Sequence, residues 1–121
     1  MISICAIGIG NRARKYLEYV EANPDKAKVC AVVDNDPYRL KEARDRYSLA
    51  ESQCFTNVDD FICSGIRADG VIVATGDDTH YSISRKVIEA GMNLLLEKPM
   101  ADSIDQCREL VALAERRGVV T

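Results

Sequence analysis

Apolar residues gather in four short runs along the chain, at positions 2–8, 28–34, 70–75 and 93–98. Apolar and polar residues do not alternate within these runs, so each run predicts a strand that is covered on both faces, as in a parallel sheet. Gln53-Cys54-Phe55 is a fifth, weaker candidate. The pattern therefore predicts a sheet of about five strands that is packed on both faces.

The intervals between the runs show helical spacing. Ala13, Leu17 and Val20 follow the i, i+4, i+7 pattern of a helix that packs on a sheet. Later helices are predicted to begin at Asp36-Pro37, at Asn57, at Asp77 or Asp78, and at Ser103. In the last helix a capping box is predicted at residues 103–106, and the predicted buried stripe is Ile104, Cys107, Val111 and Ala114.

Strands and helices thus alternate along the whole chain. Because crossovers between parallel strands are right-handed, this order predicts an α/β fold, a doubly wound parallel sheet between two layers of helices. Residues 1–121 contain no repeat and no linker, and we expect them to form one domain. Val119, Val120 and Thr121 resemble the opening of a sixth strand that is cut short.

Composition narrows the classes of partner. Hydrophobic residues make up 47% of the 121 positions, charged residues 29%, and the net charge is -3, as in an ordinary globular protein. Without a basic surplus we expect no nucleic-acid partner. No apolar stretch approaches the roughly 20 residues of a membrane helix. The N-terminus has no signal-peptide pattern, so we expect no membrane partner and a cytoplasmic location.

The five cysteines and the single histidine do not indicate a metal site. No two cysteines form a C-x-x-C pair, and a zinc site is therefore not expected. Cys5 and Cys30 lie inside predicted strands, where a reduced cysteine behaves as a small hydrophobic residue. We interpret both as residues of the core.

Residues 8–13 read Gly-Ile-Gly-Asn-Arg-Ala, a G-x-G-x-x-A sequence between the first predicted strand and the first predicted helix. Gly8 would allow the tight turn, Gly10 would let a pyrophosphate approach the backbone, and Ala13 would let the helix pack closely on the sheet. The amides of the helix N-terminus, from Asn11 on, would face the phosphates. This context predicts a Rossmann-type dinucleotide site.

Asp34 ends the second predicted strand, about 20 residues after the glycine loop, where an acid binds the adenosine ribose. Its carboxylate would repel a 2'-phosphate, and neither Asn35 nor Asp36 offers a cation for one, so NAD is preferred over NADP. The alternative is that Asp34 is only a turn residue at a strand end. Arg12 is interpreted either as a pyrophosphate ligand or as part of a solvated helix face.

Two more segments should reach the same edge of the sheet. Thr75 and Gly76 follow one strand, and Glu97-Lys98-Pro99 follows another. In an open parallel sheet, ligands bind at the carboxyl ends of the strands. We therefore expect this charge pair where a nicotinamide ring would lie.

These motifs together resemble the Gfo/Idh/MocA oxidoreductase family, which includes glucose-fructose oxidoreductase and inositol dehydrogenase. They are G-x-G-x-x-A at 8–13, Asp34, A-T-x-x-x-x-H at 74–80, and A-G-x-x-x-x-x-E-K-P-x-A at 90–101. The resemblance covers essentially the whole chain. It implies an NAD(P)-dependent enzyme that transfers hydride between a nicotinamide cofactor and a sugar, polyol or similar substrate.

The resemblance also implies roles for single residues. Thr75 would lie along the cofactor and Glu97 near the nicotinamide ribose. Lys98 would reach the substrate hydroxyl or carbonyl and is the expected catalytic residue. Pro99 would fix the turn beside the cofactor, with a cis Lys98-Pro99 bond. The alternative for Lys98 is a surface ammonium paired with Glu97.

His80 matches a histidine of the family at the start of the helix after the fourth strand. The resemblance implies that it approaches the cofactor or the substrate. The alternative is an exposed polar residue in the first turn of a helix.

In the family, a second α/β domain supplies most of the substrate pocket and the residue that moves the hydroxyl proton. The resemblance therefore implies that residues 1–121 are a cofactor domain without that partner, with little or no turnover by themselves. An uncovered sheet edge or helix surface would favour a homo-oligomer, and a monomer in sedimentation would count against this expectation.

Two alternative functions stay open. One is a non-catalytic NAD-binding sensor or regulatory module. The other is a different Rossmann reductase, such as a relative of biliverdin reductase or of dihydrodipicolinate reductase. Lys98 favours the enzyme over the sensor, because a sensor needs no ammonium aimed into the cleft.

Overall fold

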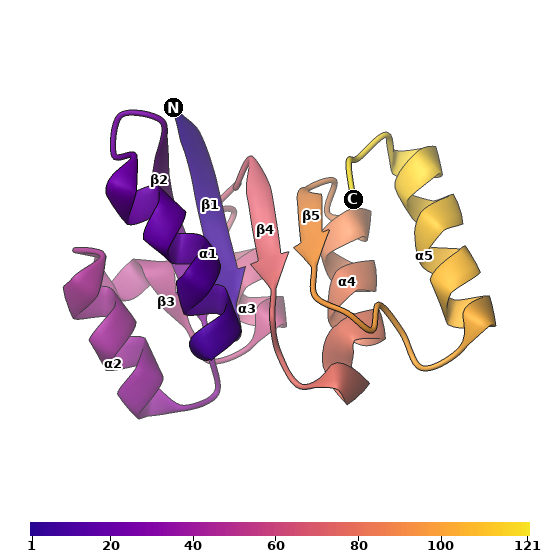
Figure 1. Ribbon diagram of the computed structural model, residues 1–121, viewed down its shortest axis with the longest axis horizontal. Helices are drawn as coiled ribbons and strands as arrows, with labels where there is room; N and C mark the ends of the chain where they lie inside the picture. Colours follow the sequence, from indigo (N-terminus) through magenta and orange to yellow (C-terminus); the bar gives the residue numbers. More distant parts are fainter.

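The computed structural model describes every residue from 1 to 121. Strands and helices alternate as predicted, and short 3-10 turns precede β3 and α4 (Figure 1). The elements are β1 Ile2–Ile7, α1 Asn11–Ala22, β2 Ala27–Val33, α2 Pro37–Arg46, β3 Cys54–Phe55, α3 Val58–Cys63, β4 Gly70–Val73, α4 His80–Glu89, β5 Asn93–Leu96 and α5 Ile104–Arg117.

All five strands are parallel and lie in the order β3-β2-β1-β4-β5. Helices α1 and α2 cover one face of the sheet, and α3, α4 and α5 cover the other, which gives three layers (Figure 1). The predicted doubly wound α/β fold is confirmed. The winding direction reverses between β1 and β4, and in such sheets the reversal opens a crevice at the carboxyl ends of the strands.

Two apolar clusters hold the layers together. On the face of α1 and α2, the fully buried Leu17 packs with Val32 and Ile72 of the sheet. On the opposite face, Phe61 of α3 and Val87 of α4 pack with residues that include Cys5. Burial raises the pKa of the Cys5 thiol, so it stays protonated in the core, as predicted.

Side chains cap the helices largely as predicted. Asp36 accepts a hydrogen bond from the Tyr38 amide at 2.9 Å, and Asn57 accepts one from the Asp60 amide at 2.8 Å. Ser103 accepts one from the Gln106 amide at 3.2 Å. The return bond of the predicted capping box is shifted by one residue, because the Gln106 side chain accepts from Asp102 rather than from Ser103.

The predicted buried stripe of α5 is wrong in part. Leu110 and Ala114 are buried, whereas Ile104 is 70% exposed and Val111 is 46% exposed. Both sets have helical spacing, so the sequence does not fix the rotation of the helix. The rotation follows from packing, since Leu110 and Ala114 share one cluster with Val87 and Ile88 of α4.

The segment after α5 lies beside β5. The Leu94 amide donates to the Val120 carbonyl at 2.9 Å, and the Val120 amide donates to the Asn93 side chain at 2.9 Å. Val119–Thr121 thus lie beside the edge strand, although the predicted opening of a sixth strand is not formed there. No helix in the structure combines the length and the apolar character needed to cross a membrane.

Candidate functional site

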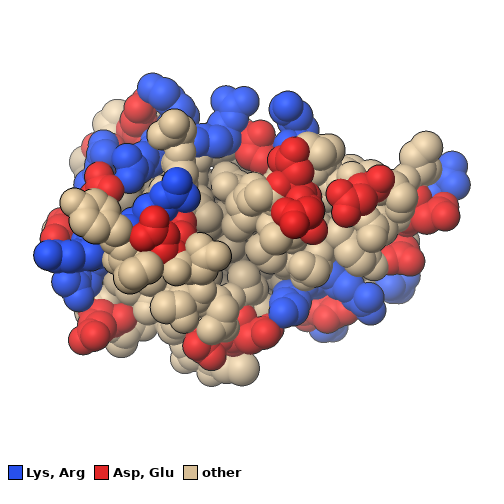
Figure 2. All heavy atoms as spheres, turned by 90° about the horizontal axis from the view of Figure 1, so that it is seen from below, with Lys and Arg blue, Asp and Glu red and all other residues tan.

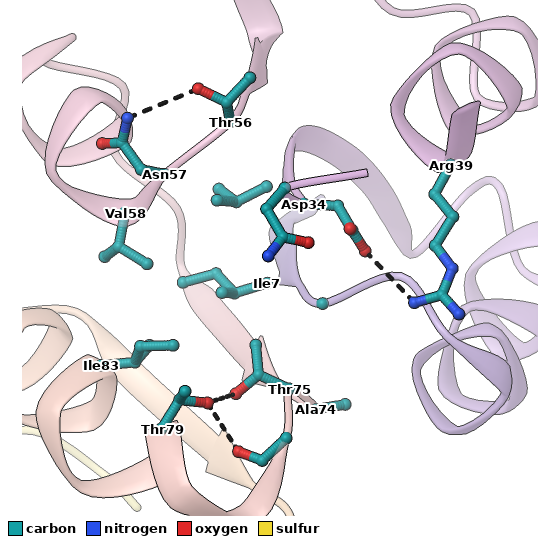
Figure 3. Close-up of a pocket in the computed structure, with 14 residues that line it drawn as sticks. Ile7, Asp34, Arg39, Thr56, Asn57, Val58, Ala74, Thr75, Thr79 and Ile83 are labelled. Carbon is teal, nitrogen blue, oxygen red and sulfur yellow. Dashed lines mark hydrogen bonds and ion pairs between the residues drawn. The ribbon is translucent and has the colours of Figure 1, made fainter. Parts of the chain in front are cut away.

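The carboxyl ends of β1, β2 and β4 surround a cavity of about 440 Å³. In the view onto this edge, acidic and basic side chains surround a hollow formed mostly by uncharged residues (Figure 2). Asp34 and Arg39 lie on one side of the cavity, and Thr75 and Thr79 lie on another (Figure 3). The glycine loop and the end of β4, far apart in sequence, therefore meet at one site.

Gly8 is required at its position for two reasons. Its φ is +81°, a conformation that L side chains rarely adopt. A Cβ atom there would also lie 2.8 Å from the Ala74 carbonyl oxygen and 2.8 Å from the Thr75 methyl carbon. The Gly8 amide donates to the Val33 carbonyl at 2.8 Å. The loop is thus pressed between the ends of β2 and β4.

Gly10 has no such neighbour. A Cβ atom at this residue would meet only the Arg39 guanidinium, at 3.8 Å. Gly10 also begins α1 without a side-chain cap, and the first turn contains no acidic residue. The amides of the first turn, at Asn11, Arg12 and Ala13, therefore have no side-chain cap at the positive end of the helix dipole. This arrangement fits a pyrophosphate group.

Asp34 binds the glycine loop itself. Its side chain is 5% exposed. One carboxylate oxygen accepts from the Ile9 amide at 2.8 Å, and the other accepts from the Asp36 amide at 2.9 Å. Each oxygen keeps further lone-pair capacity on the side of the cavity that Asp34 lines. Asp34 therefore stabilises the turn after β2, and its role as a ribose ligand stays a prediction that these contacts allow.

Arg39 was missed, because the search for a cation after Asp34 considered only Asn35 and Asp36. The first turn of α2 brings its guanidinium to 3.9 Å from the Asp34 carboxylate (Figure 3). The same guanidinium lies 3.9 Å from the Asp36 carboxylate. Its side chain is half exposed and lines the cavity. The i, i+3 spacing from the helix cap Asp36 is the signal that identifies it.

Glu97 is held by α1. The Tyr16 hydroxyl donates a hydrogen bond to its carboxylate, and Arg12 lies 3.2 Å from the same oxygen. The hydrogen bond from Tyr16, followed by the charge of Arg12, lowers the pKa of Glu97, and the same hydrogen bond raises the pKa of Tyr16. Arg12 and Tyr16 are spaced i, i+4, which places both on one face of α1 and was the available signal for Tyr16.

Lys98 is exposed and takes part in none of the ion pairs of the structure. The ion-pair partner of Glu97 is Arg12 rather than Lys98, while the exposed position of Lys98 agrees with the surface alternative. The Lys98-Pro99 peptide bond is cis, as predicted. The turn leaves the ammonium of Lys98 without an ion-pair partner.

His80 is 1% exposed, so the alternative of an exposed polar residue is wrong. Its Nδ1 lies 2.7 Å from the Pro99 carbonyl oxygen, and its Nε2 lies 3.1 Å from the Thr75 carbonyl oxygen. Both nitrogens thus face the backbone of this chain. Its contacts are to two loops of the site, and the expected approach to the cofactor stays a prediction.

The sequence of residues 2–121 matches the family described as "Oxidoreductase family, NAD-binding Rossmann fold", GFO_IDH_MocA. The chain belongs to the Gfo/Idh/MocA family. It is 31% identical to inositol 2-dehydrogenase 2 of Saccharopolyspora erythraea, over 97% of this chain and 33% of that protein. The match is to the NAD-binding Rossmann domain of these oxidoreductases. The chain spans about a third of the length of the curated relatives it matches.

Solved structures agree with this assignment. GenD2 from gentamicin A biosynthesis, in complex with NAD, is 31% identical and has a TM-score of 0.87, over 98% of this chain and 33% of that one. The WlbA dehydrogenase from Chromobacterium violaceum, in complex with NADH and UDP-GlcNAcA, is 29% identical and has a TM-score of 0.89. The match covers 98% of this chain and 33% of that one.

Proposed function

We propose that this chain is the cofactor domain of an NAD-dependent oxidoreductase that transfers hydride between the nicotinamide ring and a sugar or polyol. The observation that carries the proposal is the glycine loop, which is pressed against the end of β4 at Gly8 and bound by the buried Asp34. That packing orients the uncapped N-terminus of α1 toward the crevice of the sheet.

The proposed placement of the cofactor follows the geometry of the edge. The pyrophosphate lies beside Gly10 on the amides of residues 11–13, close to Arg12, whose guanidinium also pairs with Glu97. The adenosine ribose lies at Asp34. Thr75 lies along the cofactor, and Glu97 and Pro99 flank the nicotinamide ribose. This order uses both sides of the reversal point between β1 and β4.

Lys98 is the proposed catalytic residue. Its ammonium has no ion-pair partner in the structure and stands on the turn after β5, beside the end of β4. There it would hydrogen-bond to the oxygen of the reacting carbon, position the substrate, and stabilise negative charge on that oxygen as hydride moves. Bound NAD supplies the hydride acceptor.

The substrate class is proposed from relatives of the chain. Among them are an inositol 2-dehydrogenase and a WlbA dehydrogenase that binds UDP-GlcNAcA. Both names point to hydroxyl groups of cyclic polyols or sugars. Since these relatives are about three times longer than this chain, we propose that the substrate pocket also needs residues outside 1–121.

We propose NAD over NADP because a 2'-phosphate would approach the buried carboxylate of Asp34. Arg39 partly offsets this charge, at 3.9 Å. In calorimetric titrations we expect NAD+ to bind this chain about tenfold or more tightly than NADP+, owing to like-charge repulsion. Arg39→Ala should widen the difference, and Arg44→Ala on the same helix should not. Equal affinities, or tighter binding of NADP+, would contradict the assignment.

We also propose a location and a mode of assembly. The thiols of the chain, among them the buried Cys5, fit the reducing cytoplasm. Self-association is supported by the exposed apolar side chains Leu95, Ile104 and Val111, which lie on edge strand β5 and on α5.

A further inference from the structure

The turn that carries Lys98 is attached to the rest of the domain on both sides. On its C-terminal side the Pro99 carbonyl faces Nδ1 of His80 at 2.7 Å. On its N-terminal side the Glu97 carboxylate accepts from Tyr16 and pairs with Arg12. Lys98 itself has no partner among the ion pairs. Its position therefore depends on its two neighbours in sequence.

His80 joins this turn to the end of β4. Its ring lies between the carbonyls of Pro99 and Thr75 and is fully buried. A neutral imidazole has one N–H, which can serve one of the two carbonyls, whereas the imidazolium can serve both. In either form the rigid ring sets the spacing between the loop that ends β4 and the turn that carries Lys98. Removing the ring would take this partner from both carbonyls.

Tyr16 holds the N-terminal side of the turn through its hydrogen bond to Glu97. It belongs to α1, the helix whose N-terminus is proposed to hold the pyrophosphate. Its hydroxyl donates a hydrogen bond to Glu97 and so connects the turn to α1. The pyrophosphate site, the end of β4 and the turn of Lys98 are thus connected by two side chains that need no contact with the cofactor.

We propose that His80 and Tyr16 are positioning residues that fix the turn Glu97-Lys98-Pro99 against the cofactor site. The inference rests on the proposed function, because the turn matters only if the nicotinamide half of a dinucleotide lies beside it. Loss of either residue would loosen the turn at the nicotinamide half. The adenosine half, at Asp34 and the glycine loop, would keep its own contacts.

The test compares NAD+ with ADP, which has the adenosine and pyrophosphate groups but no nicotinamide. We expect Tyr16→Phe to weaken NAD+ binding about three- to tenfold, the range of one lost hydrogen bond, and to leave ADP binding within about twofold. Tyr19→Phe is the matched control, since Tyr19 lies on the same helix and is 59% exposed. It should change neither affinity.

Two substitutions separate the contacts of His80. The asparagine amide can replace Nδ1 and keep the bond to Pro99, whereas the glutamine amide can replace Nε2 and keep the bond to Thr75. We expect His80→Asn to retain NAD+ affinity within about threefold and His80→Gln to lose about tenfold, with ADP affinity unchanged in both. An equal loss for NAD+ and ADP, or no loss in any variant, would overturn the proposal.

A second measurement does not depend on nucleotide binding. Because His80 is the single histidine of the chain, its ring signals in NMR spectra are unambiguous. We expect a ring N–H that exchanges slowly with water and a Lys98 amide whose exchange becomes faster in Tyr16→Phe. If the wild-type chain binds neither nucleotide, the proposed function fails. These signals still decide whether His80 and Tyr16 hold the turn Glu97-Lys98-Pro99 in place. A ring N–H that exchanges rapidly and a Lys98 amide whose exchange is unchanged in Tyr16→Phe would overturn the positioning roles of His80 and Tyr16.

Discussion

Replacing Gly8 by alanine is expected to destabilise the domain by about 2–5 kcal/mol, the sum of a left-handed alanine and an overpacked contact. The new methyl group would lie 2.8 Å from the Ala74 carbonyl oxygen, which is backbone and cannot rotate away. The loop would have to move off the end of β4, so nucleotide binding should fall below detection. Urea unfolding and calorimetric titration with NAD+ would measure the two effects.

Gly65→Ala is the matched control for Gly8→Ala. Gly65 has a φ of +80°, nearly the same as Gly8, but nothing lies within 4 Å of an added Cβ atom. We expect only the conformational cost of about 1–2 kcal/mol and unchanged nucleotide affinity. If the two variants lose equal stability, the close approach of the glycine loop to β4 does not contribute to the free energy of unfolding.

Asp34→Ala is expected to cost about 2–4 kcal/mol of stability, in addition to its effect on the ribose, because two amides would lose a charged acceptor. These are the amides of Ile9, at 2.8 Å, and of Asp36, at 2.9 Å. We expect NAD+ affinity to fall at least about tenfold, since the glycine loop loses its anchor together with the ribose ligand. Thermal unfolding followed by circular dichroism, with titration of the folded fraction, would show both.

Asp36→Ala separates the helix cap from the site. Asp36 accepts one backbone hydrogen bond, from Tyr38, and its side chain is 47% exposed. Its replacement should cost about 1 kcal/mol, the value of a helix cap, and should leave NAD+ binding unchanged. A loss of binding as large as that of Asp34→Ala would contradict a specific role for Asp34.

Periodicity and strand-end motifs were sufficient to predict the order of the elements and the edge that bears the site. Gly8, Asp34 and Glu97 follow strands directly and Thr75 follows β4 after one intervening residue, and parallel strands bring such positions to one edge whatever the details of packing. The rotation of α5 could not be predicted in the same way. Leu110 and Val111 are adjacent and equally apolar, and only the contact with α4 selects Leu110.

The contacts within the site were harder to predict than its location. His80 bonds to backbone carbonyls, which leave no trace in the identity of the residues that carry them. Tyr16 and Glu97 are 81 positions apart, and their contact depends on the packing of α1 against the sheet. The contact of Arg39 with Asp36 could have been predicted, because the two residues are one helical turn apart.

The most direct test of the central claim is an amide NMR titration of this chain with NAD+. We expect shift changes at residues 8–13, at Asp34, at Thr75 and Gly76, and at Glu97 and Lys98. The amides at the opposite edge, such as Asp69 and Asn93, should not move. Shifts confined to that opposite edge, or no shifts at millimolar NAD+ in a folded chain, would contradict a dinucleotide site at the glycine loop.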